Sequence, residues 1–412
     1  MTIEQQPRVA ILGAGPVGLE AALAVAERGW DLTVFEAAGR AGGNVRDWGH
    51  VRLFTPWDMN VSERMRLALP DAPAGSSLPT GAELADLLLD PLAALPSIAP
   101  RVRLGTRVEA VAREGLLKHE EIASHARGAR RFRLLVSDAS GHESVEYADA
   151  VIDCTGTYGN PNALGDGGIP APGERALGDR IERRLPAVGG PGERAGRGKG
   201  AGRGGGAGRG FAGQTILLTG AGHSAQTAAR SLAELARDAP GTRVIWAIRS
   251  AEPTWGAVQA DPLPERAALT RAARELAGGA SDAVEPRLGH VTEALEHSAD
   301  GRINVTLRNG LPEEVTVDRV LALNGGVGDF SLYRQLQVHE CYATSAPMKL
   351  SAALLGAAAG DCLEQQSHGP DTLTNPEPGF FILGAKSYGR NSQFLMRIGW
   401  AQVDDVMGLI AG

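Results

Sequence analysis

The sequence predicts an α/β fold made of two similar units, and three observations support this prediction. Two glycine-rich turns occur, Gly13 to Gly18 near the N-terminus and Gly220 to Ala225 in the middle of the chain. Each turn stands between an apolar stretch typical of a buried parallel strand and a segment with helical apolar spacing. The next apolar stretch ends in a charged residue, Glu36 in the first case and Arg249 in the second. This order of elements is typical of Rossmann-like dinucleotide-binding domains.

The first unit begins with a predicted buried strand over residues 8–12. A helix is predicted from Pro16 to Arg28, because apolar residues recur at helical spacing and Gly29 ends the pattern. The free N–H groups and positive dipole end of this helix would face phosphates held at the turn. The residues of this turn that we expect to bind a cofactor are Gly13, Gly15, Pro16, Val17 and Gly18.

A second strand over residues 31–35 leads to Glu36. Its carboxylate can accept hydrogen bonds from both hydroxyls of an adenosine ribose, and it would repel a 2′-phosphate. The first unit is therefore predicted to bind an adenine dinucleotide without that phosphate. The alternative is a glycine-rich turn that binds nothing, but the ordered strand, turn, helix, strand and terminal acid argue against it.

The second unit repeats the pattern, with predicted strands over residues 215–219 and 243–248. Arg249 and Ser250 stand where the first unit has its acid, and a guanidinium with a neighbouring hydroxyl can hold a phosphate. This favours NADPH over NADH, the alternative being a solvated arginine at a strand end. The residues of this turn that we expect to bind the cofactor, His223 among them in preference to an acid or base role, are Gly220, Gly222, His223, Ser224 and Ala225.

Two further stretches resemble flavoproteins that have two dinucleotide-binding domains. Residues 39–44 resemble their glycine-doublet extension, which passes along the flavin diphosphate, so the resemblance implies FAD in the first unit with Gly43 and Asn44 beside it. Residues 151–156 look like the strand-end motif of the same proteins, with Cys154 in the alanine place. This implies that the chain leaves the flavin domain there and that two more residues lie at the cofactor, Thr155 and Gly156.

The order of these motifs is similar to the flavin-containing monooxygenase and thioredoxin-reductase-like group over most of the chain, and residues 211–225 are especially similar to the monooxygenases. Three departures matter. The monooxygenase signature expected upstream of the second turn is not legible in residues 169–188, and Gly384-Ala385-Lys386 replaces the Gly-Asp pair that usually touches the flavin ribityl chain. The cysteines form no CxxC pair, so dithiol exchange within the chain is not expected. There are three of them, Cys154, Cys341 and Cys362.

Connectivity predicts an FAD-binding domain over residues 1–164 and 336–412, interrupted by an NAD(P)H-binding domain over 165–335. A second strand-glycine exit at 317–325 marks the end of the insert. The glycine- and arginine-rich stretch 189–210 contains almost nothing apolar and is predicted to be a disordered loop, because it cannot repay its ordering entropy.

One segment expected to carry the chemistry, residues 47–60, directly follows the glycine doublet. The resemblance implies that Asn60 or Thr55 helps to stabilise a flavin hydroperoxide. Aromatic and basic side chains here are suited to cover the flavin; the alternative is that they pack the domain. The cofactor-binding candidates among them are Trp48, His50 and Arg52.

The other segment, residues 379–395, is predicted to contain a strand over 380–383 and a helix that begins near Ser392, a good N-cap. Related flavoproteins point this helix at the pyrimidine edge of the flavin. Lys386 and Arg390 are candidates to stabilise the reduced flavin or bind an anionic substrate, unless they are solvent-facing loop charges. The cofactor-binding candidates of this segment are Gly384 and Ser392.

Composition narrows the function classes. A formal charge of −7 gives no electrostatic reason to bind nucleic acid, and no apolar run approaches the length of a membrane span. The N-terminal residues lack the features of a secretion signal, and the few cysteines favour a reducing compartment, so a soluble cytoplasmic protein is expected. No paired histidine spacing indicates a metal site. A homodimer is left open.

The leading functional hypothesis is an FAD-dependent, NADPH-dependent monooxygenase that oxygenates a small molecule through a flavin hydroperoxide. A flavoprotein reductase or dehydrogenase that passes electrons to a small acceptor or a partner protein is the first alternative. A flavin-binding protein without catalysis is the second.

Overall fold

A computed structural model describes residues 6–188, 210–356 and 367–412. The chain divides into two compact units, the first formed by residues 1–160 and 326–412 and the second by residues 161–325. The predicted loop at 189–210 lies outside the described residues apart from Gly210.

The unit boundaries at 160/161 and 325/326 differ from those predicted at 164/165 and 335/336, by four residues and by ten. Asn162 belongs with the second unit, because its N–H donates to the Gly325 carbonyl at 2.9 Å. Leu332 and Tyr333 belong with the first, because they are buried in its core. The linear order of motifs does not reveal these contacts.

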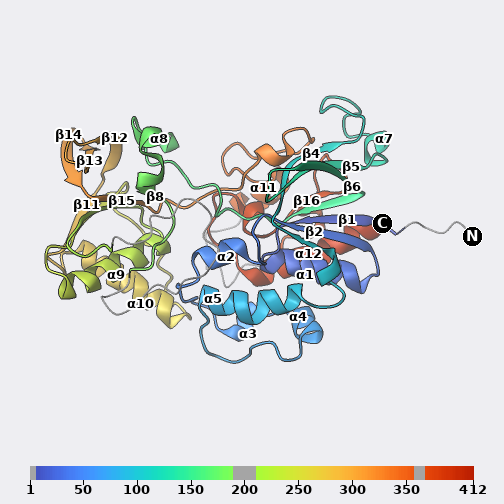
Figure 1. The fold of residues 1–412 in the computed structure, drawn as a ribbon, viewed down its shortest axis with the longest axis horizontal. Coiled ribbons are helices and arrows are strands. Elements are labelled where there is room, and N and C mark those ends of the chain that lie inside the picture. Colours follow the sequence, from blue (N-terminus) through green and yellow to red (C-terminus); the bar gives the residue numbers. More distant parts are fainter. Residues whose placement is uncertain (1–5, 189–209, 357–366) are drawn as a thin grey trace, which may run out of the picture. The chain divides into compact units, whose positions relative to one another are not determined.

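The first unit is built on a five-stranded parallel sheet with the order β16-β7-β1-β2-β3 (Figure 1). Its strands are β1 (Arg8–Leu12), β2 (Asp31–Glu36), β3 (Val102–Leu104), β7 (Ala150–Asp153) and β16 (Phe380–Ile382). The predicted strands over 8–12 and 31–35 are therefore present, the second one residue longer. Their apolar, β-branched residues are buried on both faces, as expected for a parallel sheet.

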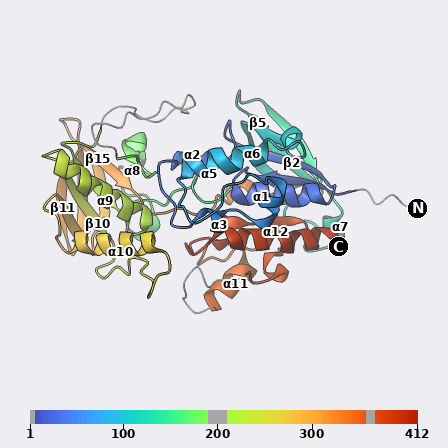
Figure 2. The ribbon, with the colours of Figure 1, turned by 90° about the horizontal axis from the view of Figure 1, so that it is seen from below.

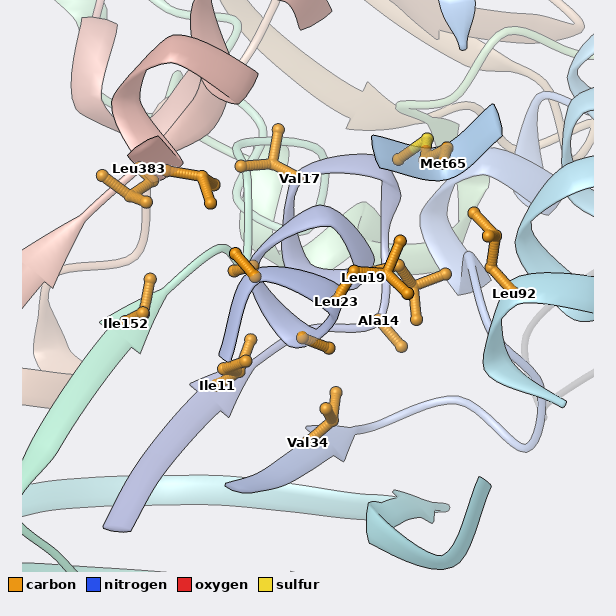
Figure 3. Close-up of a cluster of buried hydrophobic side chains, with 14 of the residues drawn as sticks. Ile11, Ala14, Val17, Leu19, Leu23, Val34, Met65, Leu92, Ile152 and Leu383 are labelled. Carbon is orange, nitrogen blue, oxygen red and sulfur yellow. The ribbon is translucent and has the colours of Figure 1, made fainter. Parts of the chain in front are cut away.

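Two layers cover this sheet. Helices α1 (Pro16–Glu27) and α12 (Met396–Ala411) lie side by side on one face (Figure 2). Figure 3 shows Val17, Leu19 and Leu23 of α1 among side chains of the strands and of neighbouring helices. The other face is covered by an antiparallel sheet of β4 (Thr106–Arg113), β5 (Phe132–Asp138) and β6 (Glu143–Ala148).

The remaining helices of this unit are short. A continuous helical segment runs through α5 (Gly81–Leu84), a π-helical turn over 85–89 and α6 (Asp90–Ala93). The others are α2 (Gly43–Asp47), α3 (Trp57–Asn60), α4 (Glu63–Ala68), α7 (His125–Gly128) and α11 (Met348–Gly356).

The second unit repeats this arrangement with the parallel order β11-β10-β9-β15-β8. Its strands are β8 (Ile181–Glu182), β9 (Thr215–Thr219), β10 (Arg243–Ile248), β11 (Val284–Leu288) and β15 (Arg319–Ala322). Helices α9 (His223–Asp238) and α10 (Pro264–Ala277) lie on one face of this sheet (Figure 1). The other face carries β12 (Val291–His297), β13 (Ile303–Asn309) and β14 (Leu311–Val317), and the short helix α8 (Glu174–Leu177) lies against β12.

The likeness of the two units extends to single hydrogen bonds. Asp149 precedes β7, and its carboxylate accepts the N–H of Arg8 at the start of β1, at 2.8 Å. Asp318 precedes β15, and its carboxylate accepts the N–H of Thr215 at the start of β9, also at 2.8 Å. The same brace therefore fixes the first strand of each unit.

The start of the last helix was predicted wrongly. Helix α12 begins at Met396 with Leu395 as N-cap, four residues after the predicted Ser392, which is exposed. The N–H of Gln393 instead donates to the Asn391 side chain at 2.9 Å, a local turn that competes with helix formation. No helix among the residues that the structure describes is long and apolar enough to cross a membrane.

Candidate cofactor and active site

The first glycine turn is packed tightly on one side and open on the other. Gly13 has a φ of +95°, and a Cβ there would lie 3.0 Å from the Cys154 carbonyl oxygen. A Cβ at Gly18 would lie 1.9 Å from the Gly13 carbonyl oxygen, so the helix can approach the turn only without a side chain. At Gly15, the N-cap of α1, no described atom lies within 4 Å of a Cβ. This leaves room for a diphosphate above the free N–H groups of the helix.

Glu36 lies beside this cradle with acceptor capacity to spare. Its two carboxylate oxygens accept the N–H groups of Ala14 and Ala38 at 2.8 and 2.9 Å. Burial raises the pKa of Glu36, and these two hydrogen bonds oppose the rise. Because a carboxylate offers about four acceptor positions, roughly two remain for ribose hydroxyls.

The glycine doublet docks on the same cradle. Gly42 has a φ of +68° as the N-cap of α2, and its N–H donates to the Ala14 carbonyl at 2.9 Å. A Cβ at Gly43 would lie 2.4 Å from the Ala38 side chain and 3.3 Å from a Glu36 oxygen. The doublet is therefore needed for this close approach, and it leaves Asn44 exposed beside it.

The second glycine turn has the same geometry. Gly220 has a φ of +107°, and a Cβ there would lie 2.3 Å from the Leu323 carbonyl oxygen. Gly222, the N-cap of α9, faces open space, and Ala225 is fully buried. Arg249 is exposed just beyond β10 and forms no hydrogen bond or ion pair with the described residues, so its guanidinium is available to a phosphate.

His223 and Ser224 follow Gly222 at the start of α9, where Ser224 is exposed and His223 is half-buried. Burial lowers the pKa of the imidazole, and the charge of Arg266 lowers it further. The Nε2 atom lies 3.6 Å from the position of a Cβ at Gly256. The ring is therefore held neutral at physiological pH against the loop that follows β10.

A pocket of about 190 Å³ in the first unit brings together both predicted catalytic residues of residues 47–60. The Asn60 amide donates to the carbonyls of Thr55 and Pro56 at 2.8 and 2.9 Å, and its oxygen accepts the Thr55 hydroxyl at 2.7 Å. Both N–H groups of Asn60 are thus committed to the loop. The lining residues are Thr55, Met59, Asn60, Phe394, Leu395, Met396 and Arg397.

The far wall of the pocket is the N-terminus of α12. No side chain caps this helix, and its first turn carries Arg397, where most helices carry an acid. Nearby, the ring of Tyr388 meets Phe394 edge-on at a centroid distance of 5.5 Å. The Tyr388 hydroxyl is buried without a hydrogen-bond partner among the described residues, and burial raises its pKa to about 12. A free donor, a helix N-terminus and an open glycine cradle fit a flavin dinucleotide.

The other candidates of residues 47–60 lie away from the pocket lining. Trp48 packs against Gly81, where a Cβ would lie 2.5 Å from its ring, which agrees with the packing alternative. Arg52 donates to the Leu78 carbonyl at 2.8 Å, and His50 is exposed. None of these three residues lines the pocket, where it could cover a flavin ring.

In residues 379–395, Arg390 is exposed and Gly384 is buried with a φ of +73°. Lys386 does not match the alternative of a solvent-facing loop charge, because it is fully buried and its Nζ lies 2.6 Å from Asp153 Oδ2. Thr155 joins this pair through its hydroxyl, and Gly156 follows with a φ of +71°.

Sequence reasoning missed Asp153 and Arg397. Asp153 lies inside the strand-end motif at 151–156, and only its neighbours in space, Lys386 and Thr155, reveal its role. Arg397 lies beyond the segment 379–395, and its place in the first turn of α12 follows from a helix start that is later than predicted.

Comparisons with known proteins agree with this architecture. Residues 11–66, less than half of the chain, match the family described as an NAD(P)-binding Rossmann-like domain. No curated protein sequence matches the chain.

Solved structures match over nearly the whole length. The bacillithiol disulfide reductase of Bacillus cereus is 18% identical with a TM-score of 0.69, covering 99% of both chains. The thioredoxin reductase of Lactococcus lactis is 16% identical with a TM-score of 0.60, covering 98% of both chains. The cadaverine monooxygenase of Erwinia amylovora, solved with FAD, is 13% identical with a TM-score of 0.61, covering 99% of this chain and 95% of that one. The chain therefore has the fold of the flavoproteins with two dinucleotide-binding domains, which thioredoxin reductases and flavin monooxygenases share.

Proposed function

We propose that the protein is an FAD-dependent NAD(P)H oxidoreductase. The observation that carries this proposal is the pair of open glycine cradles, one in each unit, whose second strands lead to residues of opposite charge. Glu36 suits a ribose with free hydroxyls, as in FAD, and Arg249 with Ser250 suits a 2′-phosphate, as in NADPH. FAD, when bound, supplies hydride acceptance from a nicotinamide.

The chain's own residues would bind and orient the cofactor. The N–H groups at the start of α1 would hold the diphosphate, and Glu36 would hold the ribose. The pocket between the Thr55–Asn60 pair and α12 would hold the ring system. There the N–H groups of α12 and the Arg397 guanidinium would stabilise negative charge at its polar edge.

We further propose that the electrons pass to oxygen and then to a small organic substrate. Flavin monooxygenases that act on cadaverine and ornithine are among the similar structures. Exchange with a disulfide through the chain's own thiols is disfavoured, because the described cysteines, Cys154 and Cys341, do not form a pair. Burial raises the pKa of the Cys154 thiol, whereas a hydrogen bond with Thr344 lowers that of Cys341.

A reductase that passes electrons to an external acceptor is the second candidate. It is supported by the similarity to the disulfide and thioredoxin reductases over nearly the whole chain. In that case the acceptor would be a separate molecule, since the described part of this chain offers no cysteine pair.

Rapid mixing separates these candidates. The FAD-loaded protein is reduced with NADPH without oxygen and then mixed with oxygenated buffer. A transient absorbance that differs from both reduced and oxidised flavin supports oxygenation, whereas direct conversion of the reduced into the oxidised spectrum supports the reductase. Protein that stays colourless after incubation with FAD overturns both, and bound FAD that neither NADPH nor NADH reduces leaves a binding protein. A substrate screen that follows NADPH consumption together with hydrogen peroxide release then identifies a true substrate, which changes their ratio.

A further inference from the structure

A lysine and an aspartate form a fully buried ion pair at the carboxyl edge of the first unit's sheet. Asp153 is the last residue of β7, and Lys386 lies in the 3₁₀ turn over 384–388 that follows β16. Their charged atoms are 2.6 Å apart, and neither side chain is exposed. Lys386 lies in the segment where the sequence departs from the Gly-Asp of related flavoproteins.

Every polar contact of the pair is made within the protein. Lys386 Nζ also donates to the Asp329 carbonyl at 2.7 Å and to the Thr155 hydroxyl at 3.2 Å. The second oxygen of Asp153 accepts the N–H and the hydroxyl of Thr155 at 3.0 and 2.7 Å. The ring of Tyr333 lies 5.2 Å from the ammonium. The two opposite charges therefore cancel in a place that water does not reach.

The position of the pair relates it to the proposed flavin site. Strands β16, β7 and β1 are parallel neighbours, so their carboxyl ends meet at one edge, which is where open α/β sheets bind ligands. The first glycine turn follows β1 and touches the chain at Cys154, next to Asp153. The turn that carries Lys386 is tied to α12, because the Gly384 N–H donates to Gln402 Oε1 at 2.9 Å.

We propose that Lys386 and Asp153 are positioning residues that set the reduction potential of the bound flavin, by keeping this edge of the sheet electrically neutral. Reduction adds negative charge to a flavin, and a single uncompensated charge acts strongly in a poorly hydrated site. A carboxylate alone would oppose reduction, and an ammonium alone would favour it. The proposal rests on the proposed function, since it requires bound FAD.

The test uses variants that unmask one charge at a time. Lys386→Met leaves the carboxylate, and Asp153→Asn leaves the ammonium. Both are titrated spectroelectrochemically as FAD-loaded protein against wild type at the same pH. Lys386→Met is measured at about pH 8.5 and Asp153→Asn at about pH 6.5, because burial without a partner favours the neutral form of either group.

We expect the potential to fall in Lys386→Met and to rise in Asp153→Asn, each by at least a tenfold change in the equilibrium constant of reduction, which is about 30 mV for two electrons. The double variant should return to within half of that shift from wild type. Shifts of the same sign, or no shift in either variant with FAD bound, would overturn the proposal.

A buried ion pair at the opposite edge of the same sheet provides the control. Glu377 precedes β16 and pairs with Arg113 and Arg127, all three buried. Glu377→Gln unmasks charge far along the strands from the glycine turn, and it should leave the potential unchanged even where it lowers the melting temperature. If Lys386→Met does not fold, the Asp153→Asn and double variants still decide the sign. If FAD does not bind to the wild type, the proposed function fails instead.

Discussion

The two glycines at positions 15 and 18 should respond in opposite ways to the same substitution. Gly15 has a φ of −82° and a ψ of −174°, which any residue adopts, and a Cβ there meets no described atom within 4 Å. A Cβ at Gly18 overlaps the Gly13 carbonyl oxygen at 1.9 Å. If Gly15 is open because a diphosphate approaches it, Gly15→Ala should weaken FAD binding and spare the apoprotein, whereas Gly18→Ala should damage the apoprotein itself.

The magnitudes follow from these contacts. Gly15→Ala lowers the conformational entropy of the unfolded chain, which stabilises the fold, and it replaces a favourable N-cap residue, which destabilises it. The free energy of unfolding should therefore change by no more than about 1 kcal/mol. Displacing the diphosphate from one charge-assisted N–H bond costs about 1.5–3 kcal/mol, which raises the Kd for FAD roughly 10- to 100-fold. Gly18→Ala forces backbone against backbone and should cost about 3 kcal/mol or more, lowering the melting temperature by roughly 10 °C.

Thermal unfolding of flavin-free protein measures the first quantity, and quenching of FAD fluorescence on titration measures the second. Gly222→Ala serves as the matched control, because it has the same open geometry in the second unit and should leave FAD binding unchanged. The reasoning fails if Gly15→Ala binds FAD as wild type does, or if it destabilises the apoprotein as much as Gly18→Ala.

Three other substitutions test single contacts. Arg249→Ala should raise the KM for NADPH roughly 10-fold or more and that for NADH much less, because only the former carries a 2′-phosphate for the guanidinium; equal effects in steady-state kinetics would remove the phosphate role. His223→Gln should flatten the acid side of the stability profile. Because the pKa of His223 is lowered on folding, the unfolded chain binds a proton more readily than the folded chain once the pH drops below the ordinary histidine pKa, and the free energy of unfolding then falls with pH. Urea unfolding at several pH values measures this fall, and a variant with the same pH dependence as wild type contradicts the reasoning. Tyr388→Phe removes a buried hydroxyl that has no described partner, so the apoprotein should be equally stable or more stable by about 1 kcal/mol; if FAD uses this hydroxyl, the melting gain on adding FAD should shrink in the variant, and an unchanged gain argues against the contact.

The strands and the first helix could be predicted from local sequence. The strands at 8–12, 215–219 and 243–248 have the expected bounds, since each is a short apolar run between turn residues. The close packing at Gly13, Gly18 and Gly220 also follows from the motif. These are local signals, and they need no knowledge of the rest of the fold.

The contacts that join distant segments could not be predicted in this way. The Lys386–Asp153 pair spans 233 positions, and nothing in either local sequence distinguishes a buried lysine from a loop charge. The start of α12 was misplaced because Ser392 is a good cap by residue type, while the Asn391–Gln393 turn takes its place in the structure. A tertiary contact decided the place of Lys386, whereas a competing local hydrogen bond displaced the helix start from Ser392.

The two units close equivalent sheets with strands from opposite ends of their segments, which explains why their boundaries resist prediction. In the first unit, β16 beside β7 comes from the last part of the chain, whereas in the second unit, β8 beside β15 precedes the other strands. The sequence therefore contains two matching strand-turn-helix-strand motifs, but the segments that flank them in the chain differ. The shared part carries the glycine turn and the hydrogen bond from the first strand to Asp149 or Asp318. If the charged residue at the end of the second strand selects the dinucleotide, as proposed, exchanging Glu36 and Arg249 should alter the choice of cofactor without altering either sheet.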